Sequence, residues 1–132
     1  MARLTQIAPH LAVEDVDASL AFYRDGLGFT VASSRGEYGE TFRAMLQRDG
    51  VTVVLQRNDL GDKAARLARH TWGDVVLYVY CTNAQGEWAD LKDRGVEVGD
   101  IDRTEDGMDE FVVRDPDGYV LVFGSDVPAG AR

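Results

Sequence analysis

The stretch VEDVDASLAFYRDGLGFTV, residues 13–31, carries the signals of a strand, a helix and a second strand. Leu11 and Val13 alternate as in a half-buried strand, and apolar residues at helical spacing follow them. Asp15 or Asp17 can cap this helix. Gly28 then ends it, because glycine readily adopts the left-handed conformation found at helix C-termini. We therefore predict a strand, a helix and a strand in this order.

The same pattern recurs in the second half of the chain. An apolar strand, a helical segment and a glycine are followed by alternating residues: Tyr78-Val79-Tyr80, Asn83 to Arg94, Gly95 and Val96-Glu97-Val98. Three pairs of landmarks lie 67 positions apart: Val13 and Tyr80, Ala21 and Trp88, and Gly28 and Gly95. This constant offset predicts two similar modules in tandem that share one core.

Each module reads as β-α-β-β-β. In the first, we expect strands near 6–13, 28–34, 40–48 and 51–57, with a hairpin turn at Arg48-Asp49-Gly50. In the second, we expect strands near 75–81, 96–103, 109–114 and 119–124, with a turn at Asp115-Pro116-Asp117-Gly118. The modules cover about 1–57 and 74–126. The linker, 58–73, should hold a short helix from Lys63 to His70 capped by Asp62. The predicted fold class is α+β, in a single domain over 1–132.

Composition narrows the possible functions. The chain has 132 residues, of which 45% are hydrophobic and 28% charged, as is typical of one soluble globular domain. A net charge of −9 argues against a nucleic-acid partner and is compatible with a cationic ligand. We see no membrane span and no signal peptide, and therefore expect a cytoplasmic protein with no membrane partner. The single cysteine, Cys81, cannot form an internal disulfide, and we assign it no chemical role.

Motifs at both ends of the chain fit one known pattern. They are Val13-Glu14-Asp15, Ser19, Phe22-Tyr23 and Leu27-Gly28-Phe29 at the front, and Phe111 with Arg114-Asp115-Pro116-Asp117-Gly118-Tyr119 at the back. These motifs resemble the vicinal oxygen chelate superfamily, which contains glyoxalases, extradiol dioxygenases, fosfomycin-resistance enzymes and bleomycin-resistance proteins. Further residues are most similar to the bleomycin-binding proteins: Met1-Ala2-Arg3-Leu4-Thr5, Pro9, Leu11, Asp15-Val16 and Glu110-Phe111.

The resemblance implies the vicinal oxygen chelate fold, a cup-shaped mixed sheet with helices outside and a ligand pocket inside. In enzymes of the superfamily, metal ligands come from the cup-facing side of the first and last strands of each module. Those positions fall here on Ala8, on Val54, at or beside Val75, and on Val122. None of these side chains can bind a metal. We therefore expect no metal and no other cofactor.

A metal site would have to use neighbouring residues. His10, Gln56 and Asp74 lie one or two residues from the superfamily's positions. Two residues along a strand displace a side chain by roughly 7 Å, so the site would need a rebuilt geometry. One imidazole, one neutral amide and one carboxylate make a poor site for zinc and an incomplete one for iron or manganese. This set is the alternative to the metal-free interpretation.

The cup-facing residues are suited to a small-molecule ligand. By alternation, His10 lies on the face opposite Leu11 and Val13. Four residues would give an apolar floor with a few polar groups: His10, Val54, Gln56 and Val122. Met45 adds a soft surface for planar ligands. Trp72 either stacks on a ligand or plugs the space between the modules.

A hairpin near the rim of the cup adds Met108 and Asp109 to the predicted ligand residues. Its acidic string, Glu105-Asp106 and Asp109-Glu110, either attracts a positively charged drug or forms a solvated loop. The bleomycin-binding proteins place a drug-stacking tryptophan and a glycine where this chain has Gly107 and Met108. A stacking contact of about 1 kcal/mol or more is lost there. The resemblance therefore supports the scaffold more strongly than it supports bleomycin as the ligand.

We predict a metal-independent small-molecule-binding protein with no catalytic residues, which gives antibiotic resistance by sequestering a bleomycin-like or other planar or cationic natural product. The alternative is a metal-dependent lyase, isomerase or dioxygenase that uses His10, Gln56 and Asp74. We also expect a homodimer, because each module leaves one side of its cup open. Pro9 provides a hinge in the first strand, and the resemblance implies exchange of that strand between subunits.

Overall fold

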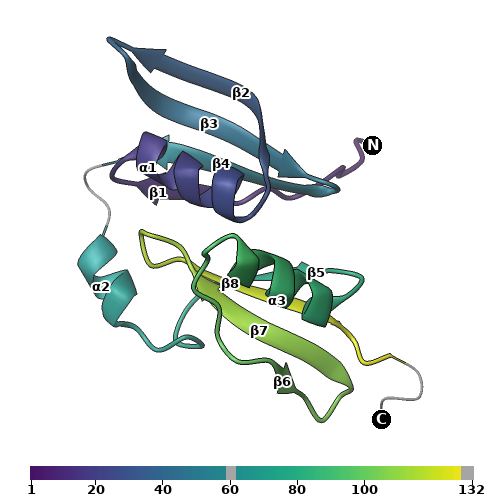
Figure 1. Cartoon of the computed structure of the whole chain (residues 1–132). Helices are drawn as coiled ribbons and strands as arrows, with labels where there is room; N and C mark the ends of the chain where they lie inside the picture. Colours follow the sequence, from purple (N-terminus) through teal and green to yellow (C-terminus); the bar gives the residue numbers. More distant parts are fainter. Residues whose placement is uncertain (59–61, 129–132) are drawn as a thin grey trace.

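The computed structural model, which describes residues 1–58 and 62–128, contains two four-stranded mixed sheets (Figure 1). The first comprises β1 (His10–Val13), β2 (Thr30–Glu37), β3 (Glu40–Arg48) and β4 (Val51–Arg57). The second comprises β5 (Val76–Tyr80), β6 (Asp102–Arg103), β7 (Met108–Arg114) and β8 (Val120–Asp126). Their orders are β1-β4-β3-β2 and β5-β8-β7-β6, with the first two strands of each order parallel. The predicted α+β class and the repeated β-α-β-β-β order are confirmed.

The first helix begins where predicted. Asp15 caps α1 (Val16–Leu20) by accepting a hydrogen bond of 3.1 Å from the backbone N–H three residues later. The helix continues as a π-helical segment, η1 (Ala21–Gly26), whose end is marked by a 3.0 Å bond from the Leu27 N–H to the Phe22 carbonyl. Gly28 follows with a φ of +81°, a conformation that side chains beyond glycine rarely adopt. The predicted glycine stop is confirmed.

The first strand is shorter than expected. It was predicted over 6–13, whereas β1 starts at His10. The Pro9 carbonyl still accepts a 2.9 Å bond from Val54, but proline has no N–H to donate to a ladder. Residues 1–9 belong to no strand, and the side chains of Leu4 and Ile7 are 102% and 94% exposed. The N-terminal segment therefore has no place in the sheet of its own chain.

The second module departs from prediction at one strand. After α3 (Ala84–Asp93) and Gly95, whose φ is +84°, a strand was expected over 96–103, but β6 covers only Asp102–Arg103. The Trp88 indole N–H donates a 2.8 Å bond to the Gly99 carbonyl, and the Gly99 N–H donates to Val112 at 3.0 Å. These isolated bonds replace a continuous ladder, so the alternation of Val96-Glu97-Val98 reflects side-chain burial alone.

The linker helix α2 (Lys63–Ala68) ends two residues earlier than the predicted 63–70. Asp62 occupies the N-cap position, but its side chain forms no capping hydrogen bond in the described structure, so the predicted cap is wrong. Two arginines attach the helix to the second module instead. Arg66 donates from Nε to the Asp117 carbonyl at 3.0 Å, and Arg114 donates to the Arg66 carbonyl at 2.9 Å.

The turn at residues 115–118 joins the two modules. Asp115 and Asp117 are buried, with 3% and 2% of their surface exposed. The Tyr23 hydroxyl donates to the Asp115 carboxylate at 2.7 Å. Asp117 accepts bonds from the Ser19 hydroxyl at 3.3 Å and the Glu14 N–H at 3.1 Å. A turn predicted from its proline and glycine thus satisfies polar groups of the first helix across the interface.

The turn of the first module makes the reverse connection. Arg48 donates two bonds of 2.5 and 2.6 Å to Glu87 on α3, and a third of 2.9 Å to the Leu27 carbonyl. Between these joints lies one hydrophobic core with side chains from both modules, including Val13, Tyr23, Leu91, Phe111 and Phe123. Figure 1 shows α1 and α3 in the middle of the molecule, with β2 and β3 at one end and β6 and β7 at the other.

The repeat offset at the helices differs from that at the first and last strands of each module. The helix-ending glycines lie 67 positions apart, but the equivalent strand pairs are His10–Val54 and Tyr78–Val122, which lie 68 apart. The predicted equivalence of Val13 and Tyr80 is therefore wrong. Val13 is fully buried in the core, whereas Tyr80 is 76% exposed. Because side chains alternate along a strand, one residue of slip places them on opposite faces.

Candidate functional site

The side of each sheet that faces away from the shared core is called its outer face here. On the first sheet this face carries four predicted ligand residues: His10, Met45, Val54 and Gln56. His10 and Met45 flank Val54 on the adjacent strands, and Gln56 lies two residues further along β4. Val54 is fully buried yet lies outside the core cluster, whereas His10 is exposed. An open hollow of about 550 Å³ borders Gln56.

The outer face of the second sheet is more aromatic. Val122 lies between Tyr78 and Val112, and the next row holds Tyr80, Gly124 and Glu110. Met108 follows Glu110 on the same side of β7, because side chains alternate along a strand. Val122 has no exposed surface, as is also true of Val54. These two valines therefore lie beneath the surface of the outer faces, and the neighbouring side chains are exposed to solvent.

Tyr78 and Glu110 form a cross-strand pair on this face. The Tyr78 hydroxyl donates a bond of 2.7 Å to Glu110 Oε2. Desolvation of the phenol and the adjoining carboxylate raise the pKa of Tyr78, so the hydroxyl remains a donor. The rings of Tyr78 and Tyr80 lie 4.7 Å apart between centroids, tilted by 46°. A Cβ at Gly124 would lie 2.0 Å from the Tyr78 hydroxyl oxygen, so glycine leaves room for that ring.

Two predicted residues do not share this arrangement. Asp109 lies on the opposite side of β7, 2% exposed, where it pairs with Arg103 at 2.9 Å and accepts a bond of 3.1 Å from Gln85. The hydrogen bond from Arg103 lowers the pKa of Asp109. Trp72 precedes β5, at the opposite end of that strand from Tyr80. At 55% exposure it does not plug the space between the modules.

Sequence reasoning missed Tyr78 and Tyr80 as site residues. Under a uniform offset of 67, Tyr80 corresponds to Val13, a core position. The offset of 68 instead matches Tyr78 to His10, which alternation already placed outside the core. An alignment of the two modules on their first and last strands, instead of on their helices, would have identified Tyr78 and Tyr80.

The side chains at the positions where the resemblance predicts metal ligands do not fit a metal. Val54 and Val122 carry no donor atom, and Ala8 precedes the first strand. Of the alternative set, His10 and Gln56 share the first sheet, while Asp74 precedes β5 of the second sheet and pairs with Arg69. Within residues 1–58 and 62–128, no group of three or more His, Cys, Asp or Glu side chains could hold a metal ion. We derive no metal-dependent step.

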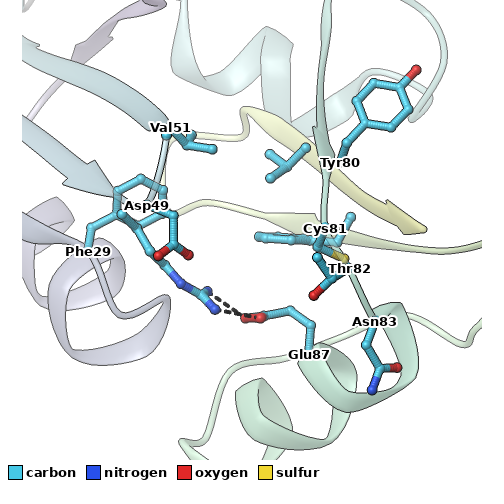
Figure 2. Close-up of a pocket in the computed structure, with 12 residues that line it drawn as sticks. Phe29, Asp49, Val51, Tyr80, Cys81, Thr82, Asn83 and Glu87 are labelled. Carbon is cyan, nitrogen blue, oxygen red and sulfur yellow. Dashed lines mark hydrogen bonds and ion pairs between the residues drawn. The ribbon is translucent and has the colours of Figure 1, made fainter.

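A cleft of about 500 Å³ opens where the modules meet, and Figure 2 shows the residues that line it. Phe29, Cys81 and Glu87 border it, but none of the predicted ligand residues does. The charged groups Arg48 and Glu87 pair with each other here, and desolvation raises the pKa of the Cys81 thiol. Tyr80 also borders this cleft, although Figure 2 shows its ring directed away from Phe29 and Glu87. The cleft lies between the modules and meets the second outer face at Tyr80.

The described part of the chain has no helix long and apolar enough to cross a membrane. A family model described as the Glyoxalase/Bleomycin resistance protein/Dioxygenase superfamily matches residues 3–123. No curated protein sequence matches the chain significantly.

Three solved structures have the same fold. A bleomycin-binding protein from Streptomyces verticillus, complexed with copper(II)-bleomycin, is 20% identical over 93% of this chain and 97% of that chain, with a TM-score of 0.69. A bleomycin resistance determinant encoded on transposon Tn5 is 21% identical over 93% and 98%, with a TM-score of 0.74. The antibiotic binding protein TnmS3 from Streptomyces sp. CB03234 is 20% identical over 96% and 98%, with a TM-score of 0.70.

Proposed function

Because the chain belongs to the glyoxalase/bleomycin resistance protein/dioxygenase superfamily, we propose that it binds and sequesters a planar or cationic natural product without a metal. The observation that carries this proposal is the chemistry of the outer faces. Val54 and Val122 stand where the resemblance predicts metal ligands, and both are fully buried beneath polar and aromatic neighbours. Apolar support with a few polar groups is typical of sites that bind small molecules. Among structures of the same fold, two are described as a bleomycin-binding and an antibiotic binding protein, and a third as a bleomycin resistance determinant.

The proposed binding unit is a homodimer. Each outer face is open in the single chain, and residues 1–9 belong to no strand of their own sheet. Exchange of this segment with a second subunit would bury Leu4 and Ile7, which are almost fully exposed otherwise. The ligand would then lie between outer faces of two subunits, bordered by His10, Met45 and Gln56 from one face and by Met108 from the other. We place this activity in the cytoplasm.

The test is a binding screen with bleomycin, both metal-free and copper-loaded, and a panel of other planar antibiotics. We expect at least one to bind stoichiometrically in calorimetry and to raise the melting temperature, since a ligand that binds only the folded state stabilises it. Expression of the protein should protect a sensitive bacterium from that compound. A panel without any stoichiometric ligand would contradict the proposal.

A variant of His10 tests the site itself. His10→Ala should weaken binding by about 1 to 2 kcal/mol, the value of a lost polar contact. The melting temperature should stay unchanged, because the side chain is exposed. Arg24→Ala, on η1 and paired with its exposed neighbour Asp25, is the matched control. Unchanged affinity together with a lower melting temperature in His10→Ala would assign His10 to the fold instead.

The alternative is a metal-dependent lyase, isomerase or dioxygenase that uses His10, Gln56 and Asp74. The ion pair of Asp74 with Arg69 and its location in the other module do not favour this set. A submicromolar metal site abolished by His10→Ala would favour it.

A further inference from the structure

The outer face of the second sheet has an aromatic and acidic end. Tyr80 is 76% exposed, and its ring lies against that of Tyr78. Glu110 stands beside them on β7, in register with Gly124, which is itself in register with Tyr80. The face thus presents an exposed π-surface next to a carboxylate. Planar rings stack on such surfaces, and cations are attracted both to the ring faces and to the carboxylate.

The position of the carboxylate is fixed by the fold. Glu110 Oε2 accepts the 2.7 Å bond from Tyr78, and the Tyr78 ring lies across Gly124 in the space that any other side chain would fill. A bond from a neutral hydroxyl leaves the negative charge of a carboxylate uncompensated. The charge of Asp106 also acts on Tyr78, so the surroundings are negative. The chain as a whole carries −9, which favours the approach of a cation.

The first sheet provides an internal comparison. Arg43 lies on β3 in register with Gln56, and Glu110 lies on β7 in register with Gly124. Gln56 and Gly124 are themselves equivalent under the offset of 68 between the last strands, so Arg43 and Glu110 occupy equivalent places on the two outer faces. The two faces therefore carry opposite charges at the same position. At this position the second face has a negative charge beside the exposed ring of Tyr80.

We propose that Glu110, together with Tyr78 and Tyr80, makes the second outer face selective for planar aromatic groups that carry a positive charge. This inference rests on the proposed binding function and names the chemical class that the site prefers. The rings supply stacking, which any planar molecule gains. The Glu110 carboxylate attracts only a cation, and this attraction distinguishes charged from neutral planar groups.

Three probes with one ring system test the selectivity: the cation 10-methylacridinium, neutral acridine in mildly alkaline buffer, and anionic acridine-9-carboxylate. We expect the cation to bind the full-length protein about tenfold more tightly than acridine, and the anion to bind most weakly. Glu110→Gln keeps an acceptor for the Tyr78 hydroxyl but removes the charge, so it should abolish the preference with little effect on acridine. Tyr80→Leu should weaken all three probes.

Arg43→Gln is the matched control on the other sheet. It also changes one charge at the equivalent position, and the preference for the cation should persist. Equal affinities for the three probes, a preference that survives Glu110→Gln, or binding of none of the probes would each overturn the inference. The antibiotic screen decides the proposed function separately, because a stoichiometric antibiotic ligand with no preference among the acridines would remove the charge selectivity alone.

Discussion

The Tyr23 hydroxyl donates a 2.7 Å hydrogen bond to the Asp115 carboxylate across 92 positions of sequence, and both side chains are buried. Arg48, which precedes Asp115 by the repeat offset of 67, makes the corresponding connection from the first module to Glu87 on α3. In both cases the last hairpin turn of one module is bound by the helix of the other. These two joints hold the modules together and thereby orient their outer faces.

Removal of the Tyr23 hydroxyl should destabilise the fold. Tyr23→Phe leaves one oxygen of the buried Asp115 without its hydroxyl donor, at a cost of about 1 to 3 kcal/mol in the free energy of unfolding. Urea denaturation measures the change. Tyr38→Phe, which removes the same atom from a ring that is 102% exposed, is the control and should have no effect. Equal stabilities of the two variants would show that the Tyr23 bond contributes nothing net.

The buried Asp115 should give the stability a defined pH dependence. Desolvation by burial raises the pKa of Asp115. Since the folded state then holds this proton more strongly than the unfolded state, the contribution of Asp115 to stability falls as pH rises from about 4, the unfolded pKa, through the raised folded pKa. Asp115→Asn removes this titration. The stability of the variant relative to the parent should therefore increase as pH is raised through that interval.

Denaturation curves at a series of pH values test this sign. Asp25→Asn, at an exposed carboxylate paired with Arg24, is the control. Because an exposed ion pair contributes little to stability, the stability of this variant relative to the parent should change little over the same pH interval. Parallel pH curves for Asp115→Asn and the parent protein would contradict the prediction.

The ion pair between Arg48 and Glu87 should couple the modules energetically. Its two side chains are 31% and 10% exposed, and removal of either leaves a largely buried partner. A double-mutant cycle with Arg48→Met and Glu87→Gln should give a coupling of about 1 to 3 kcal/mol, less than for a fully buried pair because Arg48 is partly solvated. The exposed pair Arg24 and Asp25 should show no measurable coupling. Additive effects at Arg48 and Glu87 would rule out this joint.

Deletion of residues 2–8 should convert the proposed dimer into a folded monomer. Within the single chain these residues form no strand, whereas Pro9 retains its bond to Val54. Light scattering at micromolar concentration should give a dimer mass for the full chain and a monomer mass for the shortened one, with unchanged circular dichroism. A monomeric full-length protein would end the dimer proposal, and a dimeric shortened protein would end strand exchange.

Divalent metals should bind weakly. Titration with zinc, nickel, manganese and iron(II) should reveal no stoichiometric site tighter than tens of micromolar, which corresponds to roughly 6 kcal/mol. The melting temperature should therefore change little on addition of metal. The reason is the donor set: His10, Gln56 and Asp74 offer one imidazole, an amide and a carboxylate already paired with Arg69. A tight one-to-one site lost in His10→Ala would reverse this expectation.

Local signals predicted most of the fold because they act over a few residues. The strands near 40–48 and 51–57 and the stops at Gly28 and Gly95 follow from alternation and from the conformational freedom of glycine. The strands expected at 6–13 and 96–103 are present only at their C-terminal ends, His10–Val13 and Asp102–Arg103, for a different reason. Alternation reports which side chains are buried, but a strand also needs a partner for its backbone. Residues 1–9 belong to no strand of their own sheet, where only the Pro9 carbonyl has a bond in the described structure, and the Gly99 carbonyl accepts its hydrogen bond from the Trp88 side chain.

The candidate site was predicted in part. Alternation placed His10 opposite Leu11, and the positions of Val54 and Val122 on equivalent last strands also followed from sequence. The same reasoning could not assign Asp109 and Glu110 to their faces. Adjacent residues on a strand lie on opposite faces, but both residues here are acidic, so the sequence does not show which of the two lies on the outer face. The structure places Asp109 against Arg103 and Glu110 against Tyr78.

By itself, the sequence determined the two modules, their element order and the absence of donor side chains at the inherited metal positions, because these depend on residue identity and short-range periodicity. Only the tertiary structure decided that Asp115 and Asp117 are buried joints, and that Tyr78, Tyr80 and Glu110 share one outer face. The physical reason is register. A slip of one residue between helix and strand reverses which side chains face the core, and hydrogen bonds between distant segments, such as Tyr23 to Asp115, exist only once both modules have packed together.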